Sequence, residues 1–210
     1  MKLNGQFVIS EDKRRLQRDF FVRDGLIVAK ELLGKVLVHE TAAGKVRGII
    51  TEVESYMGIH DKGSHTYGGR RTQRTEPMFH QGGTSYVYFT YGMYHCMNIS
   101  TGEAEDPQAV LIRGVIPADP KSEEYMMSLR INASKKKNVE SIRKHLADGP
   151  GKLCIAMDIS RADNDVDMVT SDTFYVTEGI DIDPERIQAG KRIGIDYAEE
   201  AAEYLWRFYI

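Results

Sequence analysis

The sequence has 210 residues and a mass of 23.8 kDa, a length that favours one domain with a sizeable core. A composition of 41% hydrophobic residues with 19 glycines is typical of a globular chain, and no run approaches the roughly 18 apolar residues of a membrane span. The net charge of −3 argues against a nucleic-acid partner, but residues 1–160 carry +4 and residues 161–210 carry −7, so the charge distribution permits one.

The N-terminus and the cysteines indicate the compartment. The first 21 residues turn charged before a signal-peptide hydrophobic region could form. Cys96 and Cys154 lie far apart among apolar neighbours, so we expect free thiols in a reducing compartment. Because the sequence has no long basic tail, we expect a cytoplasmic, nucleoid-associated bacterial protein, or a nuclear one if the chain is eukaryotic.

The first elements combine one helix with a hairpin. We expect residues 1–20 to be a flexible or peripheral segment. Residues 24–35 have apolar side chains at helical spacing, and Gly34 stands where a helix would end. Residues 35–41 and 45–56 read as two strands joined by a short Ala-Ala-Gly turn, hence as a hairpin.

The remaining elements predict the fold class. Residues 58–84 are rich in glycine and lack periodicity, and a loop of this length is usually functional. Three further strands are expected over 85–91, 93–100 and 108–117. Residues 121–158 look helical with a break at 149–151, and short strands over 173–179, 191–195 and 205–210 surround one small helix. This order predicts a single α+β domain over residues 1–210, with a curved, largely antiparallel sheet, a protruding hairpin and surrounding helices.

Four tyrosines crowd the predicted hairpin over residues 85–99. Their rings could stack on a planar heterocycle, or they could simply pack a core. Tyr86 and Tyr88 share one strand face, whereas Tyr91 precedes Gly92 at the turn. We expect Tyr86 and Tyr94 only to pack.

A pair of carboxylates precedes this hairpin. Glu52 and Glu54 fall on one face of a strand by period two, with Tyr56 next in line. They are either exposed glutamates or include a general base that takes a proton from water. His65 follows eleven residues after Glu54, and a lone histidine decides little by itself.

Together these residues form a recognisable series of blocks. The blocks are E-V-E-S-Y-x-G-x-x-D-x-x-S-H (52–65), M-F (78–79), G-x-x-Y-V-Y-x-x-Y-G-M-Y-x-C-M-N (83–98), A-V-L-I-R (109–113), G-P-G-K-L (149–153), R-I-G-I (192–195) and W-R-F (206–208). In order and spacing they closely resemble the alkyladenine (3-methyladenine) DNA glycosylases, from about residue 20 to the C-terminus.

The resemblance implies roles for individual residues. It implies that Glu54 activates the attacking water, with Arg113 as its partner. It implies a base pocket walled by Tyr56, His65 and Tyr88, in which Asn98 rejects the 2-amino group of ordinary guanine. Insertion into the duplex is expected of Tyr91 and Met93. Contacts with the DNA backbone are expected of basic residues: Arg70, Arg71, Arg74 and Lys152.

The resemblance also implies a reaction. The enzyme would flip alkylated or deaminated purines out of duplex DNA and hydrolyse the N-glycosidic bond, leaving an abasic site for base excision repair. The substrate class includes 3-methyladenine, 7-methylguanine, hypoxanthine and etheno-adenine. The matching blocks contain no lysine nucleophile, so we expect a monofunctional enzyme. It would act as a monomer on double-stranded DNA, with no cofactor, no metal and no membrane partner.

Two alternatives remain from the residues alone. A carbohydrate glycosidase could use Glu52 and Glu54 as an acid–base pair, since i and i+2 positions lie roughly 6.5–7 Å apart on a strand. A non-catalytic protein that binds damaged DNA could use the same aromatic hairpin without releasing a base.

Overall fold

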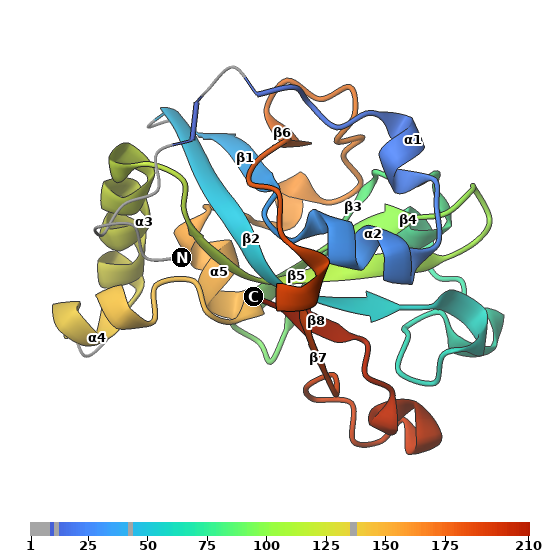
Figure 1. Ribbon diagram of the computed structural model, residues 1–210. Helices are drawn as coiled ribbons and strands as arrows, with labels where there is room; N and C mark the ends of the chain where they lie inside the picture. Colours follow the sequence, from blue (N-terminus) through green and yellow to red (C-terminus); the bar gives the residue numbers. More distant parts are fainter. Residues whose placement is uncertain (1–8, 11–12, 42–43, 135–137) are drawn as a thin grey trace.

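The computed structural model describes residues 9–10, 13–41, 44–134 and 138–210 (Figure 1). The described residues up to 117 supply two α-helices and most of the sheet, with bounds α1 Arg18–Phe21, α2 Gly25–Leu32, β1 Val36–Thr41, β2 Gly44–Tyr56, β3 Ser85–Thr90, β4 Tyr94–Thr101 and β5 Gln108–Pro117. The second half supplies the remaining helices and three short strands: α3 Pro120–Ala133, α4 Val139–Lys144, α5 Pro150–Ala156, β6 Phe174–Thr177, β7 Gln188–Gly190 and β8 Arg207–Tyr209.

All of these strands belong to one curled sheet. The order is β3-β4-β5-β2-β1-β6, and β8 pairs with both β2 and β7. Every strand pair in the described residues is antiparallel. The prediction of an α+β fold with a largely antiparallel sheet is therefore confirmed, as is the β3–β4 hairpin.

The predicted helices form where their end signals stand. Asp24 accepts hydrogen bonds from the backbone N–H groups of Leu26 and Ile27, which caps α2. Gly34 follows α2 with φ +83°, a conformation that favours glycine. The helical region predicted over 121–158 forms α3, α4 and α5, and α5 begins after Gly149 with Pro150 in its first turn.

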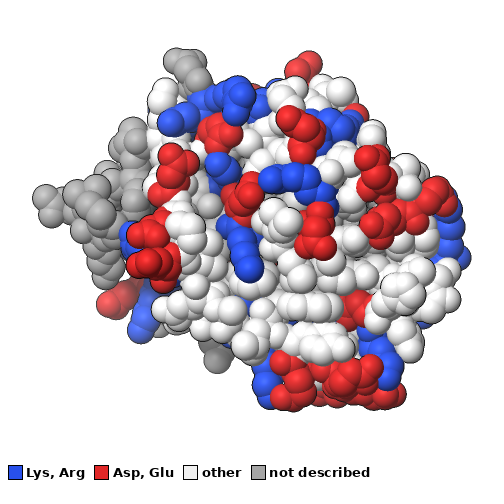
Figure 2. All heavy atoms as spheres, turned by 45° about the vertical axis from the view of Figure 1, so that its right-hand side comes forward, with Lys and Arg blue, Asp and Glu red and all other residues white. Residues whose placement is uncertain are grey.

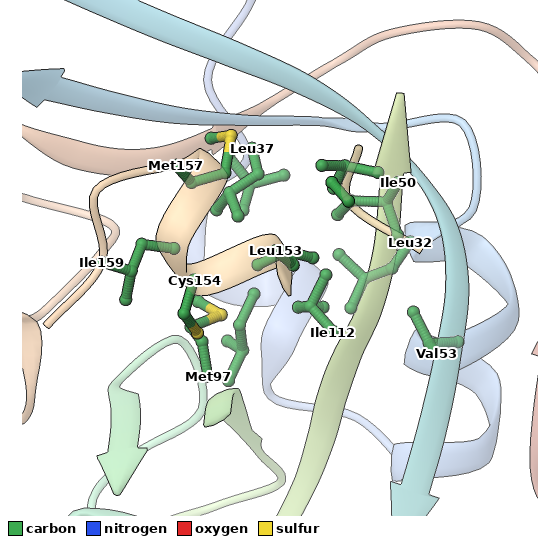
Figure 3. Packing of buried hydrophobic residues seen from close by; sticks show 14 of the residues in the cluster. Leu32, Leu37, Ile50, Val53, Met97, Ile112, Leu153, Cys154, Met157 and Ile159 are labelled. Atoms are coloured by element: carbon green, nitrogen blue, oxygen red, sulfur yellow. The ribbon is translucent and has the colours of Figure 1, made fainter. Parts of the chain in front are cut away.

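The core lies between the inner face of the sheet and helices α2 and α5. Figure 3 shows Leu153 of α5 and Leu32 of α2 meeting Ile112 of β5 in this core, and all three are buried. Cys96 and Cys154 are both buried free thiols, as predicted. Because side chains alternate along a strand, the residues between these core positions point to the opposite face of the sheet.

One predicted strand is wrong. Residues 191–195 join none of the described strands; the nearby strand is β7, which ends at Gly190. The pattern R-I-G-I resembles an alternating strand, but the Arg192 side chain turns inward and Gly194 has φ +81°. The N–H of Ile193 donates to a side chain instead of to a neighbouring strand.

The N-terminal segment is described in part. Of the expected peripheral residues 1–20, those at 1–8 and 11–12 lie outside the described residues, as does the 42–43 turn of the β1–β2 hairpin. Leu16 is buried in the core, and its N–H donates to the Val176 carbonyl of β6. Within the described part of the chain, none of the helices has the length and hydrophobicity that crossing a bilayer requires.

A buried histidine links β1 to the segment after α5. His39 Nδ1 lies 2.8 Å from the Met157 carbonyl oxygen, and Nε2 lies 3.2 Å from Asp163 Oδ1. Burial alone would lower the pKa of His39, but Asp163 and the Met157 carbonyl together raise it above its ordinary value. Both ring nitrogens face acceptors, so the charged imidazole suits this site.

We expect this histidine to make stability depend on pH. A raised native pKa stabilises the fold fully below pH 6.5, and the stabilisation disappears as the pH rises through the native pKa. His39→Gln should therefore lower the free energy of unfolding by about 1–3 kcal/mol at pH 6 and by less at pH 9. Urea denaturation at both pH values measures this, and a difference that does not change with pH would contradict it.

Candidate active site

Four strands place one row of side chains on the face opposite the core. The sheet register pairs Tyr86 with Asn98, Asn98 with Leu111, and Leu111 with Glu54. Two residues further along β2, Tyr56 points to the same face by the strand alternation. Local strand geometry therefore brings together residues that are up to 57 positions apart in the sequence.

This row borders a pocket of about 370 Å³, a size typical of small-molecule sites. The predicted site residues that line the pocket are Tyr56, His65, Tyr88, Tyr91, Asn98 and Arg113. Arg74, expected to contact the DNA backbone, lines it as well. The long loop between β2 and β3 supplies His65 and Arg74, and the segment between β7 and β8 supplies Ile193 and Tyr197.

Glu54 lies directly behind the pocket surface and is fully buried. Its Oε1 accepts a hydrogen bond of 2.7 Å from the N–H of Ile193, and its Oε2 accepts one of 2.9 Å from the Tyr56 hydroxyl. Arg113 Nη1 lies 3.4 Å from Oε1. Burial raises the pKa of Glu54, although Arg113, Ile193 and Tyr56 oppose this rise. The site thus holds a basic carboxylate beside a pocket.

Glu52 has a different environment. The same Arg113 donates through Nε to Glu52 Oε1 at 3.0 Å, so the two glutamates do share one strand face. Arg207 Nη1 donates to the same oxygen at 3.1 Å. Two guanidinium groups thus converge on the carboxylate of Glu52, which orients Arg113.

His65 is held against the aromatic wall. Its Nδ1 lies 2.9 Å from the Tyr86 hydroxyl, and its ring meets that of Tyr88 edge-on at 4.8 Å. Burial, followed by the charges of Arg74 and Arg70, lowers the pKa of His65 to about 4. His65 is therefore a neutral hydrogen-bonding group at physiological pH. Tyr86, which we expected only to pack, orients it.

The predicted DNA-backbone residues are spread over different surroundings. The guanidinium of Arg74 lies 4.8 Å from the centre of the Tyr88 ring, at the pocket wall. Arg71 instead forms ion pairs with Glu76 and Glu105, and Lys152 pairs with Asp148. Figure 2 shows acidic and basic side chains interspersed over the face that it presents.

The hairpin tip projects into solvent beside the pocket. Tyr91 and Gly92 have φ values of +51° and +68°, and Met93 N–H donates back to the Thr90 carbonyl. Positive φ at both central residues is typical of the type I′ turn, which favours Asn-Gly. Tyr91 is 84% exposed and Met93 64%. The large aromatic side chain of Tyr91 is thus exposed to solvent, and its backbone adopts a conformation that tyrosine does not favour.

Asn98 stands on the floor of the pocket with its orientation fixed. Its Nδ2 donates to the Tyr86 carbonyl at 3.0 Å, and the side chain is buried. An amide held in this way cannot turn aside to admit a larger ligand, so it limits what fits beside it.

Sequence reasoning missed three contributors to the site. Ile193 acts through its main chain, which no side-chain pattern reveals. Arg192 and Asp61 form a buried ion pair behind Tyr56. Both belong to blocks noted in the sequence, which was the available signal. Combined with the flat aromatic walls, these contacts create a slot for a planar ring next to a group that can accept a proton.

The chain is similar to known proteins over nearly its whole length. A family model described as methylpurine-DNA glycosylase matches residues 19–210. A relative from Clostridium acetobutylicum is 48% identical over 196 residues, covering 93% of this chain and 94% of the relative. Relatives from Clostridium botulinum (strain Alaska E43) and Clostridium perfringens (strain SM101) are 47% and 46% identical, each covering 93% of this chain and 95% of the relative. All three are named "Putative 3-methyladenine DNA glycosylase".

The backbone of Tyr91 leads to a prediction about stability. Replacing Tyr91 with Asn gives the Asn-Gly pair that the turn favours and removes little buried surface. The free energy of unfolding should therefore rise by about 0.5–1 kcal/mol. Urea denaturation measures the change, and Tyr94→Asn on the adjoining strand serves as a control that should give no gain. A less stable Tyr91→Asn protein would show that the tyrosine contributes to folding.

Proposed function

The chain belongs to the methylpurine-DNA glycosylase family, and on this basis we propose that it is a monofunctional enzyme that excises alkylated or deaminated purines from duplex DNA. The observation that carries the proposal is the fully buried carboxylate of Glu54 behind an aromatic-walled pocket. A purine inside a duplex cannot reach such a site, so the enzyme must rotate the nucleotide out of the helix.

Aromatic residues supply much of the free energy for this rotation. The exposed Tyr91 would fill the gap that the base leaves, with Met93 beside it. In the pocket, the rings of Tyr56 and Tyr88 would stack on the flipped base, and each stacking contact is worth about 1–3 kcal/mol. His65, neutral at physiological pH, would hydrogen-bond to the base edge.

Glu54 would act as the general base. Its raised pKa gives it a stronger pull on a proton than an exposed glutamate has. A water molecule on the pocket side of Arg113 and Ile193 would give its proton to Glu54 while its oxygen attacks C1′. The positive charge of Arg113 keeps the carboxylate ionised before the reaction.

For alkylated purines, the leaving group explains why one carboxylate suffices, whereas a neutral base such as hypoxanthine would also have to take up a proton as it leaves. Glycoside hydrolysis passes through an oxocarbenium-like state and usually needs a second carboxyl group as acid. A purine alkylated at N3 or N7 already carries positive charge and leaves without protonation. Among the described residues that line the pocket there is no lysine, which supports hydrolysis by water without a covalent step that cuts the strand.

Asn98 would act as the selectivity gate. Its amide is fixed by the Tyr86 carbonyl on the pocket floor, so an ordinary guanine would meet it with the 2-amino group. Hypoxanthine lacks that amino group and would fit.

The first test compares the two neighbouring glutamates on duplexes that contain methylated purines or hypoxanthine. Glu54→Gln should lower the single-turnover rate of base release by about 10²–10⁴, the usual contribution of a general base. Glu52→Gln should have a much smaller effect, because Glu52 only orients Arg113. Free bases are measured by chromatography.

Three results would contradict the proposal. No free base from the wild-type protein would favour a protein that only binds damaged DNA. Equal losses in the two variants would favour an acid–base pair like that of carbohydrate glycosidases. A DNA strand cut at the lesion without added alkali would rule out a monofunctional enzyme.

The second test concerns the hairpin tip. Tyr91→Asn should lower the flipping equilibrium for etheno-adenine at least tenfold, because one aromatic stacking contact in the duplex is lost. The fluorescence of the etheno-adenine base on binding reports flipping directly. An unchanged equilibrium would remove Tyr91 from this role.

A further inference from the structure

Behind the pocket lies a fully buried ion pair that the proposed chemistry does not use. Arg192 donates to both carboxylate oxygens of Asp61, at 2.5 and 2.8 Å, and neither side chain has any exposure to solvent. A buried pair of this kind is costly to desolvate, so it is weak evidence for stability alone. Its other contacts indicate what it is for.

Arg192 contacts the two residues of β2 that directly follow Glu54. Its Nη1 donates to the carbonyl of Ser55, the residue between Glu54 and Tyr56. Its guanidinium lies 4.8 Å from the centre of the Tyr56 ring. Through the backbone of the next residue, Ile193, the same segment donates to Glu54. Displacing Arg192 would therefore displace a hydrogen bond of the general base.

Asp61 holds the start of the long loop between β2 and β3, the loop that supplies His65 to the pocket. Its carboxylate accepts from the N–H of Met57, at the end of β2, and from the N–H of Gly63. These two contacts fold the start of the long loop back on β2, and the loop then leads to His65. One ion pair thus joins the loop with His65, the strand with Glu54 and the segment with Ile193.

We propose that the Arg192–Asp61 pair positions the excision site by holding the Ile193 N–H on Glu54 and the Tyr56 ring beside it. It does not touch the substrate and acts through these neighbours. The inference deepens the proposed glycosylase function and depends on it for the role of Glu54 as the base.

The titration of Glu54 reports this positioning. The groups around its carboxylate are Arg113 from β5, Tyr56 from β2, Cys96 from β4, and Arg192 with the Ile193 N–H from the segment after β7. Glu52 lies beyond Arg113. The Ile193 hydrogen bond lowers the pKa of Glu54, so losing it would move the titration to higher pH.

Arg192→Lys separates position from charge. The lysine keeps a positive charge behind Tyr56 but loses the two-pronged contact with Asp61. We expect the Glu54 titration to move up by about one pH unit or more, a tenfold change in its ionisation constant. The shift is measured by NMR on protein whose glutamate carboxyl groups are labelled with ¹³C. The signal of Glu54 is identified as the one that disappears in the Glu54→Gln variant.

The chain offers a matched control at the other end of β2. The buried Arg47 also forms an ion pair, here with the partly buried Asp119, and Arg47 binds the backbone of residues 9 and 10. Arg47→Lys should lower stability without moving the titration of Glu54. It therefore separates loss of positioning from general destabilisation.

A second variant covers the case in which Arg192→Lys does not fold. A Cβ on Gly63 would lie 2.9 Å from Arg192 Nη2, so Gly63→Ala crowds the guanidinium without removing any charge. It should move the titration in the same direction by a smaller amount.

The outcomes separate this inference from the proposed function. A Glu54 titration that is unmoved in folded Arg192→Lys or Gly63→Ala protein overturns the inference, as does an equal shift in Arg47→Lys. Base release is the second readout: an upward shift in the acid limb of its pH profile supports the inference. A wild-type protein that releases no base overturns the proposed function, while the NMR titration still tests the positioning by the ion pair.

Discussion

The rest of the site depends on the burial of one carboxylate. Glu54 has no contact with bulk water, and a buried charge persists only where donors replace its hydration. Three donors meet that need: a guanidinium from β5, a hydroxyl from β2 and a main-chain N–H from the segment after β7. Each of these donors also lies at the pocket surface. The groups that stabilise the buried charge of Glu54 are therefore the same groups that hold it beside the pocket.

A simple regularity of the sheet brings these groups together. Alternation along β2, β3, β4 and β5 sends one set of residues into the core and the other set to the pocket. The register then aligns Tyr86, Asn98, Leu111 and Glu54 across four strands. The long loop and the β7–β8 segment close over this row, and the Arg192–Asp61 pair ties both of them to β2. The sheet supplies the floor, and the connecting segments supply the walls.

The sequence predicted what depends on local pattern and failed where a contact depends on the tertiary fold. Two features follow from the spacing of residues in the sequence alone: the α2 helix ends before Gly34, and Glu52 and Glu54 share one face of a strand. Residues 191–195 have a strand-like pattern, yet Arg192 finds its partner in Asp61, so these residues pair with no described strand. Tyr86 was expected only to pack, because the sequence does not reveal which group its hydroxyl contacts. The three-dimensional structure shows that this group is His65.

The most direct test of the central claim is the pH dependence of 3-methyladenine release by the wild-type protein under single-turnover conditions, because this alkylated base leaves without protonation. A buried general base with a raised pKa predicts an acid limb governed by one ionisation, displaced above the ordinary range of a glutamate. The rate should rise through this limb to a plateau as Glu54 loses its proton. A rate that stays constant or falls as the pH rises through this range would contradict the assignment of Glu54 as the base.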